Sequence, residues 1–222
     1  MAGKITALKV QARDKHRVNV YLDGAFAFGL AAIEAARLKI GQTLSETDVA
    51  RLQGADEVEK TYERALKYLS YRPRTEAEIR RHLDRQAQSS AVMDEVLARL
   101  RRAGLVDDRA FGRFWVENRS QFRPKSGRLL KSELRQKGLT AEQAEAALAE
   151  SHGGDAEAAY QAAAARAHRL AGLPQAEFFR KLQGFLARRG FGYETIRETI
   201  ERVWREAVAE GLAPGENRES EV

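Results

Sequence analysis

The first thirty residues of the chain alternate between apolar and polar positions, as β-strands do. Side chains at every second position of a strand share one face, so the alternation predicts strands with one buried face. Asp23-Gly24, a pair typical of tight hairpin turns, precedes the last run. We expect a small antiparallel hairpin or three-stranded meander over residues 1–30, packed against a helix because so small a sheet is marginal alone. The apolar positions are Ile5, Leu8, Val10, Val18, Val20, Leu22, Phe26 and Phe28.

From Leu30 onward the apolar positions recur with the helical period. The pattern predicts a short helix that reaches about Lys39. A second helix is expected to begin after Ser45, which can cap it together with Asp48 at the third helical position. Gly54 is expected to interrupt this stretch, and a longer helix should follow it.

The rest of the chain repeats one apolar spacing three times. In each set the first gap is 4 residues and the second is 14, and successive sets are offset by 51 and then 52 residues. Each unit is expected to form three helices that are too small to bury their apolar faces alone, so neighbouring units should stack. The three sets are Ile79, Leu83 and Leu97, then Leu130, Leu134 and Leu148, then Leu182, Leu186 and Ile200.

Helix starts and stops fall between these sets. Gly104 is expected to end one helix, with Leu105 as the apolar residue after the C-cap. The middle helices of the second and third units should end at Lys137-Gly138 and Arg189-Gly190, whereas the first unit has Gln86-Ala87 there, so its turn is expected to differ.

These signals divide the chain into six segments and predict a mainly α fold, with three tandem three-helix repeats after a small β-structure. The segments are 1–30, a β-hairpin or meander; 31–60, a helical connector; 61–106, 107–153 and 154–211, the three repeats; and 212–222, a flexible tail.

The amino-acid composition indicates the cellular compartment in which the protein is expected to work. The chain has no cysteine, which excludes disulfides and thiolate metal sites and fits a reducing compartment. Its first residues lack the apolar core of a signal peptide, and no run approaches the ~18–20 apolar residues of a membrane span. We expect a cytoplasmic protein that does not contact a membrane. No heptad pattern predicts a coiled-coil dimer, so a monomer is expected.

Positive charge is concentrated in the middle of the chain. The net charge is +6, but residues 64–137 hold 19 Lys and Arg against 9 Asp and Glu, while the remainder holds 19 against 23. A basic middle segment indicates a polyanion or an acidic protein surface as the partner. The alternative interpretation is an ordinary solvated helix surface.

No catalytic constellation is present in the sequence, and neither enzyme activity nor a cofactor or metal is expected. No two histidines stand four residues apart, and no HExxH motif occurs. Asp107-Asp108 follows a helix stop and precedes a helix, so capping of that helix is favoured over metal binding. The four histidines are His16, His82, His152 and His168.

The segment from Pro124 to Arg128 is rich in donors and opens a helix, so it could hold a phosphate or a carboxylate of a partner. It lacks the first glycine and the GK[ST] ending of a P-loop, which argues against ATP binding. In the helix that follows, Arg128, Lys131 and Arg135 share one stripe, apart from the apolar positions. The predicted contact residues for a polyanion or an acidic protein partner are Arg72, Arg74, Lys125, Arg128, Lys131, Arg135, Lys137, Arg188 and Arg189.

Four aromatic residues near this region, Phe111, Phe114, Trp115 and Phe122, could stack on nucleic-acid bases. The helical spacing of the first three favours a place in the core instead.

Three blocks of sequence resemble the RecX family in their residues, order and spacing. The resemblance is firm over about residues 61–150 and looser up to Trp204, and the N-terminal strands are similar to an extension found in part of the family. The blocks are ALKYLSYRPRTEAEI at 65–79, GLVDDRAF at 104–111 and ELRQKGL at 133–139.

The resemblance implies an elongated, curved body of three tandem three-helix units. It also implies binding to the RecA nucleoprotein filament, contact with single-stranded DNA or with duplex DNA, and inhibition of strand exchange, ATP hydrolysis and co-protease activity. Two other classes stay open at this point: a repressor-like DNA-binding protein without a recombinase partner, and a nuclease, which the absence of a clustered acidic or histidine site disfavours.

Overall fold

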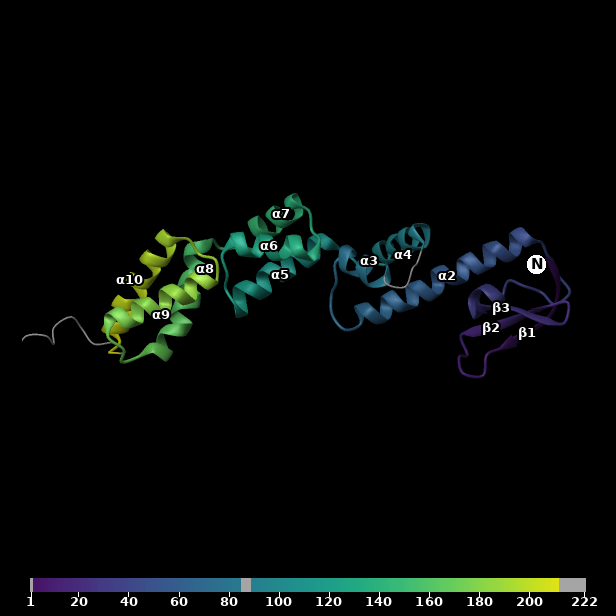
Figure 1. Cartoon of the computed structure of the whole chain (residues 1–222), viewed down its shortest axis with the longest axis horizontal. Coiled ribbons are helices and arrows are strands. Elements are labelled where there is room, and N and C mark those ends of the chain that lie inside the picture. The colour runs from purple at the N-terminus through teal and green to yellow at the C-terminus, as the bar shows by residue number, and fades with distance from the viewer. Residues whose placement is uncertain (1, 85–88, 212–222) are drawn as a thin grey trace, which may run out of the picture. The chain divides into compact units, whose positions relative to one another are not determined.

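The structure is a computed structural model that describes residues 2–84 and 89–211. It separates into two compact units, Met1–Asp107 and Asp108–Val222, called here the N-terminal unit and the C-terminal unit, and each is described by itself. The described chain is mainly α-helical with one small sheet at the N-terminal end, as the sequence predicts (Figure 1). The predicted tail, 212–222, lies outside the described residues.

The N-terminal sheet is antiparallel, with the strand order β3-β2-β1-β4. Its first three strands form the predicted meander, and the two-residue β4 was not anticipated. Val20 is the fully buried centre, where Leu8 pairs on one side and Phe28 on the other. The strands are β1 (Gly3–Val10), β2 (Arg17–Leu22), β3 (Ala25–Ala31) and β4 (Thr43–Leu44).

Two apolar positions of the sheet are exposed and not in the core: Val10, the last residue of β1, and Phe26. Phe28 is buried, but Phe26, two residues earlier, is exposed. The register between β2 and β3 shifts between Val20 and Tyr21, so that Phe28 pairs with Val20 while Phe26 pairs with Tyr21. This bulge breaks the alternation and turns the Phe26 ring outward.

The helical connector differs from the sequence expectation in two ways. The short helix α1 covers Ala32–Ala35 and does not reach Lys39. Helix α2 runs without interruption over Glu46–Leu69, so the break predicted at Gly54 is wrong. A glycine inside a helix costs only about 1 kcal/mol. The capping box at Ser45 and the burial of Leu52, two residues before Gly54, outweigh that cost.

Three three-helix repeats follow from α2 onward, and α2 itself extends across the expected boundary between residues 60 and 61. Each repeat has a hydrophobic core of its own. Repeat 1 contains the C-terminal part of α2, α3 (Glu76–Asp84) and α4 (Ser90–Arg102); repeat 2 contains α5 (Asp108–Phe122), α6 (Gly127–Lys137) and α7 (Ala141–Ser151); repeat 3 contains α8 (Asp155–Ala167), a 3₁₀ turn (His168–Leu170), α9 (Gln175–Arg188) and α10 (Tyr193–Ala209).

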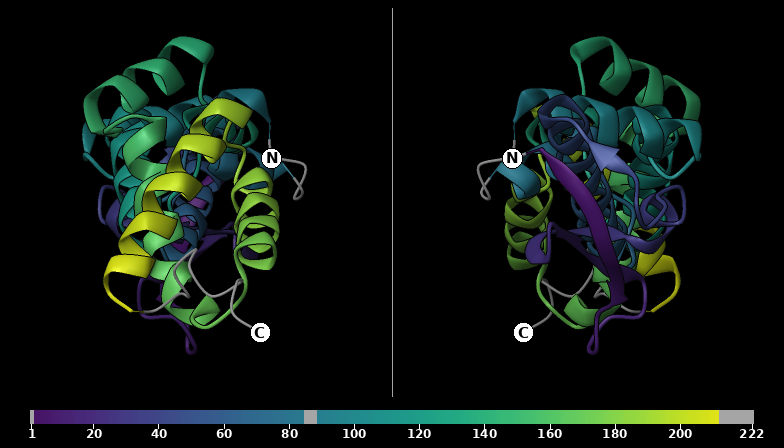
Figure 2. Two further views of the ribbon diagram at one scale, coloured as in Figure 1. Left: turned by 90° about the vertical axis from the view of Figure 1, so that its left-hand side faces the viewer. Right: turned by 90° about the vertical axis from the view of Figure 1, so that its right-hand side faces the viewer.

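The repeated 4-and-14 spacing marks the cores of these repeats. Eight of its nine positions are buried, and only Leu148 is partly buried, where it packs against the core of repeat 2. In repeat 3, helices α8, α9 and α10 lie side by side (Figures 1 and 2). Their shared core contains the third set of the spacing, Leu182, Leu186 and Ile200.

The predicted helix ends also occur. The amide of Leu105 donates to the carbonyl of Leu100 at 3.0 Å, and the amide of Leu139 donates to that of Leu134 at 3.1 Å. The glycine before each of these leucines has a positive φ, a conformation that favours a residue without a Cβ. The comparison with Gln86-Ala87 falls outside the described residues.

Candidate binding surface

Helix α6 has one buried face and one cationic face. Ser126 caps its N-terminus by accepting from the amide of Leu129, and Leu130 and Leu134 are fully buried. The stripe predicted from the sequence lies away from that core. Arg128 and Arg135 are exposed and have no ion-pair or hydrogen-bond partner in the part of the chain that the structure describes.

The middle cation of this stripe has a partner. The Nζ of Lys131 donates to the carboxylate of Glu145 on α7, and this contact holds the pKa of Glu145 below its usual range. The side chain of Lys131 is 40% exposed and that of Glu145 is 62% exposed. Exposed pairs of this kind contribute little to stability, so a stronger anionic partner could displace Glu145.

Lys125 and Trp115 share the carboxylate of Glu133, and Lys137 lies over the Trp115 ring. Glu133 accepts from the Nζ of Lys125, from the indole of Trp115 at 3.0 Å and from the Nε of Arg119 at 3.2 Å. Burial raises the pKa of Glu133, but these donors outweigh it and hold the pKa below its ordinary value. The ammonium of Lys137 lies 5.0 Å from the centre of the Trp115 ring. Lys125 is therefore part of an internal network as well as a candidate contact.

The donors of the loop before α6 are used within the protein. The amide of Gly127 donates to the carboxylate of Asp155 at 2.8 Å, and the amide of Ser126 donates to the carbonyl of Arg189 at 3.0 Å. A carboxylate of the chain itself therefore occupies the helix N-terminus at which the sequence suggested that a phosphate or a partner's carboxylate could bind.

Arg188 and Arg189 differ sharply although they are neighbours. Arg188 is exposed, and its side chain has no ion-pair or hydrogen-bond partner among the described residues. Arg189 is partly buried, donates to the carbonyl of Pro124 at 2.7 Å and lies 4.5 Å from the centre of the Phe185 ring. Burial, reinforced by repulsion from Arg123, lowers the pKa of Arg189. Arg189 thus joins repeat 3 to repeat 2.

In the N-terminal unit, Arg72 and Arg74 flank Pro73 as the sequence states. Arg72 forms an ion pair with Glu78 at 2.9 Å and also donates to the carbonyl of Pro73, and the bond to Glu78 raises the pKa of Arg72. The guanidinium of Arg74 lies 4.0 Å from the centre of the Tyr68 ring. Its Nε is buried without a hydrogen-bond partner.

The structure therefore gathers five of the nine predicted contact residues on and beside α6. Two more end α9 in the same unit, and Arg72 and Arg74 belong to the N-terminal unit. Their role in binding a partner stays a prediction.

The aromatic residues divide between core and surface. Phe111 is buried and stacks with the partly buried Trp115, as predicted. Phe114 is 50% exposed, so its expected place in the core is wrong: the face of α5 that holds Phe111 and Val116 does not extend to it. Phe122 is 67% exposed.

The groups considered for chemistry have structural contacts. His82 stacks on Tyr68 with ring centres 3.8 Å apart, and His152 contacts Asp155 at 3.2 Å. Asp108 opens α5, as expected for a residue at a helix start. Across residues 2–84 and 89–211, no group of three or more His, Asp or Glu side chains is arranged to hold a metal ion.

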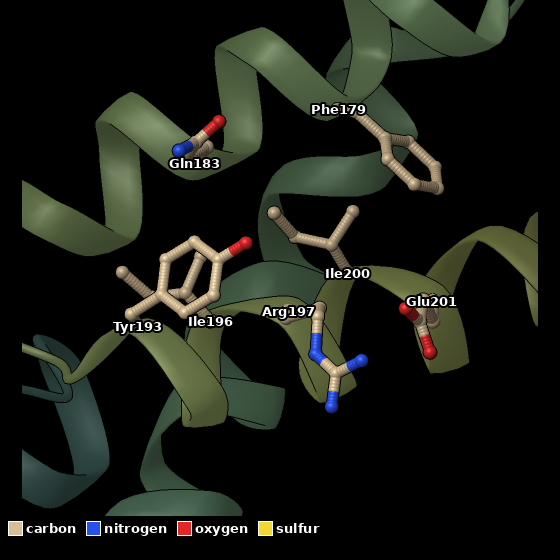
Figure 3. Close-up of a pocket in the computed structure, with 7 residues that line it drawn as sticks. All are labelled: Phe179, Gln183, Tyr193, Ile196, Arg197, Ile200 and Glu201. Atoms are coloured by element: carbon tan, nitrogen blue, oxygen red, sulfur yellow. The ribbon is translucent and has the colours of Figure 1, made fainter.

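A small pocket of about 150 Å³ lies between α9 and α10 (Figure 3). Phe179 and Gln183 contribute from α9, and Tyr193 and Arg197 from α10. Arg197 pairs with Glu194 at 3.0 Å, and Glu201 contributes a further carboxylate to the lining. None of the described helices has both the length and the apolarity needed to span a membrane.

Four family models match successive parts of the chain. They are described as the RecX regulatory protein N-terminal domain, at 3–45, and as the first, second and third three-helix domains of RecX, at 62–100, 107–148 and 154–200.

Curated relatives carry the same name. A protein of Bacillus licheniformis named "Regulatory protein RecX" is 30% identical over 200 residues, which cover 89% of this chain and 76% of that protein. A Listeria innocua protein of the same name is 33% identical over 141 residues, or 63% of this chain and 52% of that protein, so this alignment spans about half of the Listeria relative.

Solved structures of RecX proteins are also similar to this chain. One titled "Crystal structure of regulatory protein RecX" matches with a TM-score of 0.70 at 31% identity and covers 91% of this chain and all of that one. A RecX structure from Lactobacillus salivarius matches with a TM-score of 0.58 at 26% identity and covers 68% of this chain and 99% of that one.

Proposed function

The chain belongs to the RecX family of regulatory proteins, and from this premise we propose that it binds RecA filaments, with the DNA inside them, and inhibits them. Inhibition would extend to strand exchange, ATP hydrolysis and co-protease activity. The protein acts by binding, without catalysis of its own and without a cofactor, as a monomer in the cytoplasm.

The cationic face of α6 is the observation that carries this proposal. Arg128 and Arg135 are exposed and unpaired in the described part of the chain, while Leu130 and Leu134 fix the opposite face in the core of repeat 2. A rigid helix that presents unpaired arginines suits an acidic protein surface or a phosphate backbone, because arginine pairs with carboxylates and phosphates in a bidentate geometry. A RecA filament on DNA offers both kinds of anion.

The test is a filament-binding titration. Arg128→Ala with Arg135→Ala should weaken binding to RecA filaments on single-stranded DNA roughly ten- to thirtyfold, at about 1 kcal/mol for each lost contact. Adding Lys131→Ala should weaken binding further, while far-ultraviolet circular dichroism stays that of a helical protein. Arg180→Ala is the matched control, because Arg180 is exposed on α9 and has only a distant contact with Glu177, at 3.9 Å.

Two outcomes would count against the proposal. If the wild-type chain does not bind filaments but binds duplex DNA of a defined sequence, the repressor-like alternative replaces it. If it binds filaments and the α6 variants bind equally well, the contact surface lies elsewhere and the role of α6 is wrong.

A further inference from the structure

A five-residue loop occurs twice in the chain, 51 residues apart. It reads Tyr71-Arg72-Pro73-Arg74-Thr75 in repeat 1 and Phe122-Arg123-Pro124-Lys125-Ser126 in repeat 2. Both copies hold an aromatic residue, an arginine, a proline, a second cation and a hydroxyl residue in the same order. In repeat 3, Pro174 directly precedes the middle helix, which begins at Gln175, and no aromatic residue or cation stands beside the proline.

The hydroxyl residue anchors each loop at the start of the middle helix. Thr75 and Ser126 are fully buried. The Oγ of Thr75 accepts from the amide of Glu78 at 3.1 Å, and that of Ser126 accepts from the amide of Leu129 at 3.3 Å. Capping bonds of this kind fix the chain entering a helix. The positions of the two loops are therefore set by the repeats that carry them.

The aromatic residue of each loop faces solvent. The side chain of Tyr71 is 73% exposed and that of Phe122 is 67% exposed. Neither ring has an aromatic or cation–π contact in the described part of the chain. Core packing therefore does not explain the rings, although both repeats keep one at the same place. An exposed aromatic face of this kind is available to a partner.

Each loop also has one cation in an ion pair and one without an ion pair in the described part of the chain. In repeat 1, Arg72 is held by Glu78 at 2.9 Å, whereas Arg74 has no carboxylate partner among the described residues. The Nε of Arg74 is buried without a hydrogen bond, and its guanidinium lies 4.0 Å from the centre of the Tyr68 ring. In repeat 2, Lys125 is held by Glu133, whereas the side chain of Arg123 is exposed and has no ion-pair or hydrogen-bond partner among the described residues.

We propose that these two loops are single-nucleotide binding sites for single-stranded nucleic acid. The base stacks on Tyr71 or Phe122, and a neighbouring phosphate takes the unpaired arginine of the same loop, Arg74 or Arg123. A nucleotide supplies both a flat base, which can stack on the exposed ring, and a phosphate, which can pair with the arginine. An acidic protein surface would supply the anion but no regular partner for the ring.

This inference deepens the proposed function, since it names side chains that would contact the DNA of a filament. It is tested without recombinase, so its failure is distinct from failure of filament regulation. The probes are two fluorescent 20-nucleotide strands, one of thymidylate and one with abasic sites, which keeps the phosphates but lacks the bases.

The full-length wild-type chain should bind the thymidylate strand more tightly than the abasic strand. Phe122→Ala or Tyr71→Ala should each weaken binding to thymidylate about fivefold or more, the lower range for loss of one stacked base. The double variant should no longer distinguish the two strands, and Tyr71→Phe with Phe122→Trp should restore the distinction. Tyr193→Ala, which removes a ring that is 69% exposed in repeat 3, should bind as the wild type does.

Salt dependence separates the ring from the cation. Arg123→Ala should reduce the slope of log affinity against log salt by about 0.7, the value for one lost phosphate contact on a single strand. Phe122→Ala should leave that slope unchanged, because stacking releases no counterion. A double variant that still prefers bases would overturn the proposal. So would equal losses in Tyr193→Ala, or ring variants that bind DNA normally but lose RecA, since the rings would then contact protein.

Discussion

Gly190 lies at the joint between repeats 2 and 3, where an added methyl group has no space. Its φ is +86°, and a Cβ built on it would stand 2.6 Å from the Oγ of Ser126 and 3.0 Å from the Cβ of Leu129. The Oγ of Ser126 cannot simply rotate away, because Ser126 is fully buried and caps α6. Gly190→Ala must therefore either break this cap or separate the two repeats.

The loss of folding free energy expected for Gly190→Ala has two parts. The left-handed conformation costs a residue with a Cβ roughly 1–2 kcal/mol, of which about 0.5 kcal/mol is returned by a less flexible unfolded chain. Loss of a serine N-cap adds about 1 kcal/mol. Gly190→Ala should therefore destabilise the protein by roughly 1.5–2.5 kcal/mol.

Gly172→Ala is the matched control. Gly172 has a φ of +78°, and no atom lies within 4 Å of the position of its added Cβ, so this variant has the backbone strain without the collision. It should lose only about 1 kcal/mol.

Urea unfolding followed by far-ultraviolet circular dichroism measures both variants. Amide exchange at Ser126 and Gly127 should accelerate in Gly190→Ala alone, because their amides donate to Arg189 and Asp155 across the joint. Equal losses of stability in the two variants would refute the collision at the joint.

Three further changes test the internal contacts. Glu133→Gln should cost about 1–2 kcal/mol near neutral pH. The pKa of Glu133 is lowered from 4.5, so its contribution is complete above that pH and is lost as the pH falls through the folded-state pKa; a variant whose deficit does not shrink in acidic urea titrations would contradict this. Asp56 is buried and accepts from Arg17 at 2.9 Å, so Asp56→Ala should lower the free energy of unfolding by about 3 kcal/mol, and a loss of only a few tenths would contradict the buried pair. Leu134→Ala should cost about 3 kcal/mol and Leu148→Ala less, because only the first is fully buried; thermal melts with the reverse order would place the repeat core wrongly.

The repeat architecture could be predicted because it depends on period alone. Leucines at fixed gaps must share a helix face, and three equal sets fix three similar cores. The predicted break at Gly54 was wrong, because a glycine indicates only a local preference against helix. The sequence does not show that Leu52, two residues earlier, is buried and stabilises the helix there. The prediction that Phe114 is buried was wrong because helical spacing shows which side of a helix faces the core but not how wide the buried stripe is.

The sequence could predict which basic residues are candidate contacts. It could not predict which of their side chains are exposed and which pair with other groups of the protein. The sequence places Lys125, Arg128 and Arg189 in one class. Their different environments depend on Glu133 and Pro124, which folding brings close. The repeated loop was visible as a pattern, but the exposure of its rings required the structure.

The rate of ATP hydrolysis by RecA on single-stranded DNA tests the central claim most directly. Sub-stoichiometric amounts of the wild-type chain should lower that rate, and the chain should be found on the filaments. The variant with Arg128→Ala and Arg135→Ala should require a correspondingly higher concentration for the same inhibition. An unchanged rate, with no binding to filaments at any concentration of the wild-type chain, would contradict the account.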